Sequence, residues 1–338
     1  MTIDQPGDVI ALVNSASGVD LFISVVSDFD LFTKLAGRAG TVAEVAELLE
    51  IDERAADVSL TYLTALGLLE RLPGGSVRPT PAAAAYLTEG AELDVRAYAA
   101  AQKGRPGCRD AAQVLRTGKP APWESADDGG DWLARMSSTG GFATVFSAAM
   151  DARGRYLGPA LGDALRDLRP QRVLDVGGSS GIYACSLVEV LPETTAAVLD
   201  MPSVVDFSRS SIAARGLADR VDVIAGDMFA ELPTGFDVHL FSNVLHDWSS
   251  ADIERLAAAS FAALPPGGVL VDHDMHIDDD KTGPLRQAEF SVRMMLMTAG
   301  RCYSAAELTE IFRTVGFAEV THKPTTAGYS VVVARKPA

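Results

Sequence analysis

The stretch Val173–Gly181, VLDVGGSSG, decides the fold of this chain. A short apolar run that suits a buried strand leads into a turn rich in glycine, and a helical pattern begins at Gly181. In sheets of parallel strands, ligands bind beyond the carboxyl ends of the strands, and glycines such as Gly177 and Gly178 let the backbone approach a ligand closely. Ser179 occupies the position of the third residue expected in a dinucleotide fingerprint. The stretch therefore predicts a nucleotide-like ligand that is not a dinucleotide.

Short β-runs alternate with helical segments on the carboxyl side of this stretch. This alternation is typical of a parallel, doubly wound sheet, so we predict an α/β fold of the Rossmann-like kind. The expected strands are 172–176, 196–200, 221–225, 236–242 and 269–273, and the expected helices are 182–190, 204–215, 251–263 and 304–314. Two late β-runs, 318–322 and 329–334, have a short connection that predicts an antiparallel pair closing the sheet.

The part before residue 165 has a mostly helical pattern. Thr41 and Glu44 predict a capping box that opens a short helix. A second helix is expected over 54–72, and the segment 76–80 is expected to form a short β-wing after a Pro-Gly-Gly turn. These features predict a winged-helix domain over 1–165 and a sheet domain over 166–338. The second helix has arginine only near its ends, which favours burial over DNA binding. We expect a surface loop over 118–131.

Composition limits the classes of function. The chain has 338 residues, 48% of them apolar, and a net charge of −16, so it is long enough for two folded domains. An acidic surface repels nucleic acid and anionic membranes, which favours a small-molecule partner. Three widely spaced cysteines predict neither disulfides nor a structural zinc site, and the N-terminus resembles neither a signal peptide nor a membrane span. We expect a cytoplasmic protein.

Acidic residues stand at the ends of successive expected strands. Asp200 follows Gly181 by 19 residues, a spacing that suits an acceptor for both ribose hydroxyls. Asp227 suits an exocyclic amine, and Met228 and Phe229 suit the faces of an adenine ring. Each acid alone would also fit a solvated strand terminus. Their repetition at strand ends favours a ligand site.

His246 follows the fourth expected strand in the sequence FSNVLHDW. A histidine is often structural, but this one lies beyond the carboxyl end of a strand, where the ligand is expected. A neutral imidazole can take a proton from a hydroxyl or phenol as that group attacks. General base is therefore the role that we predict for His246.

The motifs LDVGG, LDMPSV, AGDMF, LHDW, LPPGG and VGF occur in that order behind the helical half. This ordered set resembles the small-molecule O-methyltransferases of the plant caffeate and bacterial antibiotic-tailoring kind. The resemblance covers essentially the whole chain. It implies a class I methyltransferase that uses S-adenosylmethionine and releases S-adenosylhomocysteine, and a homodimer formed by the N-terminal halves, which cap each other's pockets.

The resemblance also implies roles for individual residues. The expected cofactor contacts are Gly177, Gly178, Asp200, Asp227, Met228, Phe229 and Ser242, of which Ser242 replaces a lysine common in the family. His246 is the expected base, and Asp274 stands where the family usually has a glutamate that orients it. A second acid common in the family is replaced here by Cys302.

Candidate substrate contacts lie on two helical stretches. Phe142, Phe146 and Met150 recur at helical spacing where the family lines its substrate pocket, although a core stripe has the same pattern. Arg293 lies on a helix with the apolar residues Phe290, Met294 and Met297. It either pairs with a substrate carboxylate or is solvated.

The segment 272–280, DHDMHIDDD, contains two histidines and five aspartates but predicts no metal site, because strand alternation separates His273 from Asp272, Asp274 and His276. We interpret it as a solvated loop following the strand. The predicted function is methyl transfer to a small aromatic metabolite, a phenol in the favoured interpretation, of natural-product biosynthesis. Three alternatives stay open: C-methylation of a phenolic amino acid, a ligand-sensing winged-helix regulator, and a cofactor-binding scaffold with other chemistry. The sequence does not identify the methyl acceptor.

Overall fold

The computed structural model describes residues 3–121 and 142–338 of the chain. The chain forms two compact units. Unit 1 comprises Met1–Trp132 and Ile277–Ser304, and unit 2 comprises Leu133–His276 and Ala305–Ala338. This division differs from the expected boundary near residue 165. A helix before that position belongs to the sheet unit, and a helix far beyond it belongs to the helical unit.

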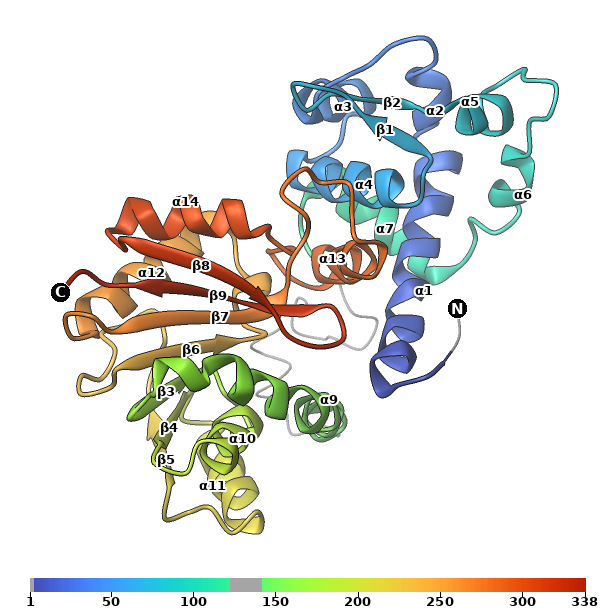
Figure 1. The fold of residues 1–338 in the computed structure, drawn as a ribbon. Helices are drawn as coiled ribbons and strands as arrows, with labels where there is room; N and C mark the ends of the chain where they lie inside the picture. Colours follow the sequence, from blue (N-terminus) through green and yellow to red (C-terminus); the bar gives the residue numbers. More distant parts are fainter. Residues whose placement is uncertain (1–2, 122–141) are drawn as a thin grey trace. The chain divides into compact units, whose positions relative to one another are not determined.

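Unit 2 contains the predicted α/β sheet, which is confirmed (Figure 1). Seven strands lie in the order β5-β4-β3-β6-β7-β9-β8, the first five of them parallel and β9 antiparallel to both neighbours. The strands are β3 (Arg172–Val176), β4 (Thr195–Asp200), β5 (Val221–Ala225), β6 (Val238–Ser242), β7 (Val269–Met275), β8 (Glu319–Pro324) and β9 (Tyr329–Arg335). Strand order reverses between β3 and β6, and ligands of open α/β sheets bind at such a switch point.

Helices cover both faces of this sheet. Figure 1 shows α10 and α11 on one face and α12 and α14 on the other. The helices of unit 2 are α9 (Phe142–Leu165), α10 (Ile182–Val190), α11 (Val205–Ala214), α12 (Ser250–Ala263) and α14 (Ala305–Val315), with 3₁₀ turns η1 (Arg166–Leu168) and η2 (Leu245–Asp247). Where bounds were expected for the strands and helices of this unit, they are within two residues of the observed ones.

Helix α9 belongs to unit 2 because it packs closely on α10. Gly154, Gly158 and Gly162 recur every fourth residue along α9, and a Cβ at each would collide with a side chain of α10. The absence of side chains at these positions lets the two backbones approach. The glycine stripe thus assigns to the sheet unit a helix that we expected in the N-terminal domain.

Unit 1 is mostly helical, as predicted. Its elements are α1 (Pro6–Ser27), α2 (Leu31–Lys34), α3 (Val42–Leu49), α4 (Glu53–Ala65), β1 (Leu69–Arg71), β2 (Val77–Pro79), α5 (Pro81–Leu87), α6 (Arg96–Ala100), α7 (Pro106–Thr117) and α13 (Leu285–Met297). The Thr41–Glu44 capping box is present. The expected helix over 54–72 is wrong at its end, because α4 stops at Ala65 before Gly67, whose φ is +75°. The following residues pair as the two-stranded wing.

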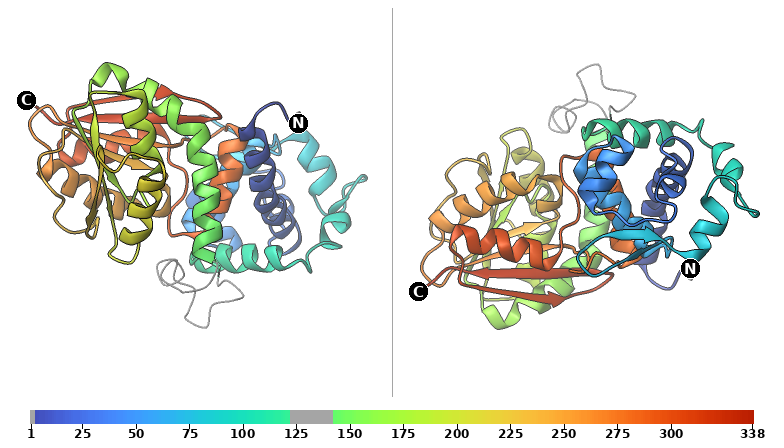
Figure 2. Two further views of the ribbon diagram at one scale, coloured as in Figure 1. Left: turned by 90° about the horizontal axis from the view of Figure 1, so that it is seen from below. Right: turned by 90° about the horizontal axis from the view of Figure 1, so that it is seen from above.

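Helix α13 joins unit 1 through contacts with α1 and α4, beside which it lies in Figure 2. Arg293 of α13 donates to Asn14 Oδ1 of α1 at 2.9 Å. Arg54 of α4 donates to the carbonyl oxygen of Gly300, just beyond α13, at 2.6 Å. An insertion between β7 and α14 therefore completes the helical unit.

Helix α1 is the one described helix that is long and apolar enough to cross a membrane, with a mean hydropathy of 1.9. We expected no such segment from the sequence. Its carboxyl-terminal half is a core element, because Leu21, Val25 and Val26 are at most 3% exposed. Packing inside unit 1 explains the apolar character of that half.

Candidate active site

The glycine-rich loop follows β3 at the switch point of the sheet. Gly177 has a φ of +71°, a conformation that glycine adopts without strain. A Cβ on Gly178 would lie 2.6 Å from Cγ of Asp175, so only glycine fits there. The backbone N–H of Ser179 donates to Oδ2 of Asp200 at 2.8 Å, which fixes the loop to the end of β4. The structure thus brings Gly177, Gly178 and Asp200 together.

Asp175 is a buried acid directly beneath this loop. It is 1% exposed, and its Oδ2 accepts from the backbone N–H of Ala184. Its Oδ1 has no hydrogen-bond partner among the described residues. Burial raises the pKa of Asp175 to about 7. An unsatisfied buried oxygen is costly, so this atom suits a hydrogen-bond donor on a bound ligand.

The end of β5 carries the residues expected at an adenine ring. Asp227 is exposed, whereas Met228 and Phe229 are half-buried. The Phe229 and Trp248 rings meet edge to face with centroids 4.7 Å apart, and the Arg255 guanidinium lies 4.9 Å from the Phe229 centroid. Trp248 was visible in the LHDW motif but had no assigned role. Its contact with Phe229 places it beside the predicted adenine-binding residues.

His246 and Asp274 form a buried pair. Nδ1 of His246 lies 2.6 Å from Oδ2 of Asp274, and His246 Nε2 lies 3.5 Å from Oδ1 of Asp247. Burial lowers the pKa of His246, but the two carboxylates raise it by more, so this pKa lies above its ordinary value. Burial raises the pKa of Asp247 to about 6. Asp247 supplies a second acid beside the base, a contact that the sequence analysis missed.

Ser242 and four other side chains form a polar cluster behind the end of β6. Ser242 Oγ lies 2.8 Å from Nδ1 of the buried His273. Asn243 donates to the Tyr183 hydroxyl at 3.0 Å and accepts from that of Tyr329 at 2.8 Å. The side chain of Ser242 is thus engaged with the protein. Its predicted contact with a cofactor remains a prediction.

Arg153 is a site residue that the sequence analysis did not identify. Electrostatic contacts place its half-buried side chain beside Tyr183, Tyr329 and Asp274, and its buried Nε has no hydrogen-bond partner among the described residues. Its signal was available, because it follows Met150 by one helical turn on the candidate stripe of α9. A half-buried guanidinium with a buried Nε at the carboxyl ends of the strands suits an anionic group of a ligand.

The other candidate substrate residues are divided between the units. Met150 is half-buried on α9, and Phe142 and Phe146 lie on the same helix, but their side chains lie outside the described part of the structure. Arg293 and Met297 belong to α13 of unit 1, where Arg293 contacts Asn14 rather than being fully solvated. Most of the expected surface loop over 118–131 also lies outside the described residues.

The interpretation of residues 272–280 as a solvated loop is wrong for its first half. The side chains of Asp272, His273, Asp274 and His276 are at most 6% exposed, because β7 lies between β6 and β9 inside the sheet and extends to Met275. Only the run 278–280 is exposed. Alternation holds as predicted, since His276 contacts Asp272. Within residues 3–121 and 142–338, no group of acids, histidines or cysteines has the geometry of a metal site.

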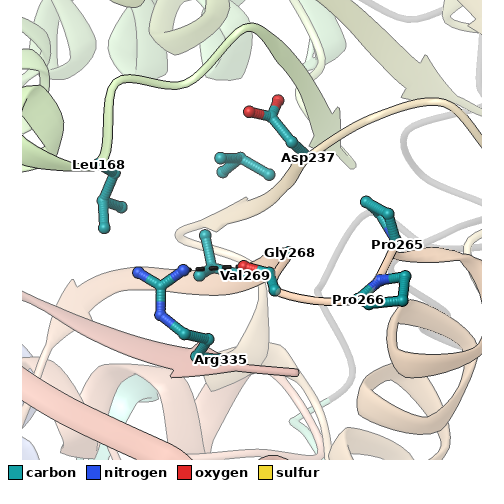
Figure 3. A pocket seen from close by; sticks show the side chains of 9 residues that line it. Leu168, Asp237, Pro265, Pro266, Gly268, Val269 and Arg335 are labelled. Carbon is teal, nitrogen blue, oxygen red and sulfur yellow. Dashed lines mark hydrogen bonds between the residues drawn. The ribbon is translucent and has the colours of Figure 1, made fainter. Parts of the chain in front are cut away.

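A separate pocket of about 200 Å³ lies at the amino ends of the parallel strands, where β6 and β7 begin (Figure 3). Its polar groups already have partners. Asp237 accepts from the backbone N–H of Arg172, and Arg335 donates to the carbonyl oxygen of Gly267. The pocket shares no residue with the candidate site at the carboxyl ends of the strands.

The strand order, the glycine loop after β3 and the acids at the ends of β3, β4 and β5 define a class I methyltransferase dependent on S-adenosylmethionine. Residues 109–318 match the model of the O-methyltransferase domain family, and the chain belongs to this family. It is 33% identical over 303 residues to 3-hydroxy-5-methyl-1-naphthoate 3-O-methyltransferase of Streptomyces sahachiroi, covering 86% of this chain and 83% of that protein. It is 32% identical to the tetracenomycin polyketide synthesis 8-O-methyl transferase TcmO of Streptomyces glaucescens, covering 98% and 97% of the two chains.

Other relatives extend this comparison. A family 2 O-methyltransferase from Planctomyces limnophilus, solved in complex with apigenin, superposes with a TM-score of 0.86 at 26% identity and covers 99% of this chain and 97% of that one. An L-tyrosine C(3)-methyltransferase of Streptomyces lavendulae is 25% identical over 93% of this chain and 89% of its own length. The predicted family, fold and cofactor are therefore confirmed, and the roles of individual residues remain predictions.

The residues of unit 2 fit the cofactor. The loop at Gly177 and Gly178 leaves the space that a Cβ would fill, and Asp200 offers acceptors for a diol. The unsatisfied Oδ1 of Asp175 and the buried Nε of Arg153 suit the polar end of an amino acid. These five residues and the ring pair of Phe229 and Trp248 together match the polar and apolar parts of S-adenosylmethionine.

Proposed function

We propose that this methyltransferase acts on a hydroxyl group of a small aromatic metabolite in natural-product biosynthesis, with His246 as the general base. The observation that carries the proposal is the buried pair of His246 and Asp274 at the carboxyl edge of β6 and β7. The names of the relatives support the substrate class, since they include a naphthoate O-methyltransferase and a structure with apigenin.

The cofactor would be held by residues of unit 2. Asp200 would accept the ribose hydroxyls, Met228 and Phe229 would flank the adenine ring, Asp227 would accept from its exocyclic amine, and Arg153 would pair with the carboxylate. Gly177, Gly178 and Ser242 would contact the same cofactor. When bound, S-adenosylmethionine supplies an electrophilic methyl group on a sulfonium and leaves as S-adenosylhomocysteine.

The protein's own task is to orient the acceptor and to remove its proton. Asp274 accepts a hydrogen bond from the Nδ1–H of His246, which leaves the lone pair on Nε2 to receive the acceptor proton. Holding the acceptor in line supplies much of the acceleration, because effective molarities of oriented groups reach about 10⁵ M or more. Phe142, Phe146, Met150, Arg293 and Met297 are the side chains proposed to contact the acceptor.

The test is an assay of the purified protein with labelled cofactor and a panel of phenolic metabolites that includes amino acids. We expect label in a phenolic product, and His246→Ala to lose most turnover while calorimetry shows unchanged binding of S-adenosylhomocysteine. Unchanged turnover in this variant would refute the assignment of the base. Absence of any calorimetric signal with the cofactor or its product would refute the cofactor site.

C-methylation of an aromatic ring is the second candidate. Two observations favour it: the similarity to an L-tyrosine C(3)-methyltransferase, and Cys302 at the position where the family often has a second acid. The position of the new methyl singlet in the product NMR spectrum distinguishes the candidates. A methoxy shift supports O-methylation and an aryl-methyl shift supports C-methylation.

We also propose that the chain forms a homodimer through unit 1. The first half of α1 exposes an apolar stripe at helical spacing, in which Val9, Leu12 and Val13 are 50% to 60% exposed. Light scattering of the wild type should give twice the chain mass, and Leu12→Asp combined with Val13→Asp should give a monomer. A wild-type monomer would exclude the dimer. The acidic composition supports a protein without nucleic-acid partners, and three free cysteines support a cytoplasmic one.

A further inference from the structure

A row of four polar side chains runs from an exposed edge of the sheet into its interior. Its members are His322, Ser330, His276 and Asp272, which we call the polar row. His322 on β8 is exposed, whereas the other three are at most 6% exposed. Nε2 of His322 lies 2.9 Å from Ser330 Oγ, Ser330 Oγ lies 2.6 Å from His276 Nδ1, and His276 Nε2 lies 2.9 Å from Asp272 Oδ2. The row is a continuous hydrogen-bonded path.

Strand register explains why these residues meet. Ser330 of β9 pairs directly with Asp274 of β7, so the two side chains lie on the same face of the sheet. Asp272 lies two residues away on that face, and His276 folds back to contact it. The inner end of the polar row therefore stands beside the acid that holds His246.

The path satisfies its hydrogen bonds in two states that differ by one proton. In the first state, Nδ1–H of His276 donates to Ser330, and the Ser330 hydroxyl donates to Nε2 of His322. In the second state, Nε2–H of His322 donates to Ser330, and the Ser330 hydroxyl donates to Nδ1 of His276. Both hydrogen bonds of Ser330 reverse, the contact of His276 with Asp272 persists, and no heavy atom has to move. Ser330 can serve both states because a hydroxyl is both donor and acceptor.

The inner end of the path retains a proton in the first state. Nε2 of His276 lies 2.9 Å from Oδ2 of Asp272, so the relay places the second proton of this pair between these two atoms. Burial raises the pKa of Asp272 to about 6, which favours a proton at this position. Among the described residues, the other ionisable groups that interact with this pair are Asp274 on β7, His246 in η2 and His322 on β8, and His273 acts electrostatically from the other face of β7. Arg153 acts on His273 and His246 from α9. The carboxylates of Asp272 and Asp274 therefore interact with both His246 and His276, and a proton gained by one imidazole disfavours a proton on the other.

We propose that the polar row is a proton relay that keeps the charge of the buried site constant during methyl transfer, with His276 as a positioning residue for His246. The inference rests on the proposed role of His246. When Nε2 of His246 takes the acceptor proton, Nδ1 of His276 gives its proton to Ser330, and Ser330 gives its own to Nε2 of His322. Nδ1 of His322 releases a proton to water. After the product leaves, His246 loses its proton and the relay reverses, so one proton is released in each turnover.

Kinetics of single variants test the relay. His322→Gln keeps a hydrogen-bonding side chain at an exposed position, but the amide neither accepts nor releases a proton as an imidazole does. Ser330→Ala removes the bridging hydroxyl. Both should lower kcat about tenfold with little change in KM, since positioned proton transfer contributes at least that much. Ser330→Thr retains the hydroxyl and should retain most of kcat. Thr321→Ala, at an exposed position of β8 outside the polar row, is the control and should match the wild type.

Rescue of kcat by added imidazole distinguishes a relay role of His322 from a structural one. His322→Ala should lose kcat and regain it in buffer containing imidazole, because a small base can replace the missing relay group. A purely structural role of His322 would give no such recovery. Unchanged kcat in His322→Gln, or a loss that imidazole does not reverse in His322→Ala, overturns the relay.

Nitrogen NMR of the whole protein with ¹⁵N-labelled histidine tests the relay without turnover. His276 and His322 should titrate together in the wild type and separately in Ser330→Ala. Independent titration in the wild type overturns the relay even if the enzyme is active. Loss of label transfer with every acceptor overturns the proposed function instead, so the two failures are distinguishable.

Discussion

Oδ2 of Asp274 lies 2.6 Å from Nδ1 of His246, and neither residue is more than 6% exposed. A carboxylate at this distance in a buried site fixes both the tautomer and the orientation of the imidazole. Because Asp274 is shorter by one methylene than the glutamate usual in the family, the pair shows that an aspartate on β7 also reaches His246.

This contact predicts the effect of Asp274→Asn. The amide can neither hold the Nδ1–H tautomer by charge nor stabilise the imidazolium, so we expect kcat to fall by roughly 10²- to 10⁴-fold. Asp274→Glu, which keeps the charge, is the matched control and should retain far more activity. Equal losses in both variants would show that packing, rather than the carboxylate, is responsible.

The raised pKa of His246 predicts the pH dependence of the reaction. A base must be neutral, so kcat/KM should rise with pH and reach half its plateau above pH 6.5. Asp247→Asn removes one of the carboxylates that raise this pKa and should move the midpoint to lower pH. A profile of kcat/KM that is flat between pH 5.5 and 8.5 would contradict His246 as the base.

Gly178→Ala should weaken cofactor binding without unfolding the protein. The new Cβ would lie 2.6 Å from Cγ of Asp175, so the loop must move away from its position. Forced overpacking typically costs about 1–3 kcal/mol, which corresponds to a loss of affinity for S-adenosylhomocysteine of roughly tenfold or more by calorimetry. Gly104→Ala is the control, because a Cβ at Gly104 meets no atom within 4 Å. Equal affinity in the two variants would contradict the proposed position of the cofactor.

Arg153→Gln should distinguish ligands by their carboxylate. If Arg153 pairs with the amino-acid part of the cofactor, the variant loses affinity for S-adenosylhomocysteine by roughly tenfold or more, since hydrogen bonds to charged groups contribute about 1.5–3 kcal/mol. Binding of 5′-methylthioadenosine, which lacks that part, should be unchanged. Arg153→Lys keeps the charge and should show the smaller loss. Equal weakening of both ligands in Arg153→Gln would indicate a structural role.

His239 predicts part of the acid sensitivity of unit 2. Its side chain is fully buried, Nδ1 lies 2.6 Å from Ser260 Oγ, and burial lowers its pKa to about 4. In the unfolded chain this imidazole takes up a proton near pH 6.5, whereas in the folded protein it does so only near pH 4. The contribution of neutral His239 to the free energy of unfolding is therefore complete above pH 6.5 and falls by about 3 kcal/mol as the pH falls toward 4. In urea titrations, His239→Asn should show a smaller decline than the wild type. Thr321→Ala, at an exposed position outside the polar row, should show the wild-type decline.

The sequence predicted the sheet unit well because its signals are local. The strands β3, β4 and β5 are short apolar runs that end in an acid or lead directly into a glycine, and the order of glycine loop, Asp200 and Asp227 follows from the order of these strands. The end of the helix over 54–72 was missed, because LLER suits a helix and a strand equally and only pairing with Val77 decides between them. The packing of α9 was missed because a stripe of glycines matters only once α10 lies against it.

The candidate site was predictable where a motif marks it and unpredictable where tertiary contacts build it. His246 and Asp274 stand at strand ends that the hydrophobic pattern reveals. Arg153 reaches the site through helix packing, and His276 meets Ser330 through strand pairing over 54 residues, a contact that alternation on one strand does not reveal. Long-range register supplied the information that the motifs lacked.

The insertion Ile277–Ser304 has a consequence for engineering. The chain passes from one unit to the other three times, so neither unit is a contiguous stretch of sequence. Consider a chimera that joins the first 165 residues of this chain to the rest of a homologue. Its α1 and α4 would pack against the homologue's α13, and its α9 would pack against the homologue's α10. Modules exchanged between relatives should therefore carry the insertion together with the N-terminal helices and leave α9 with its sheet.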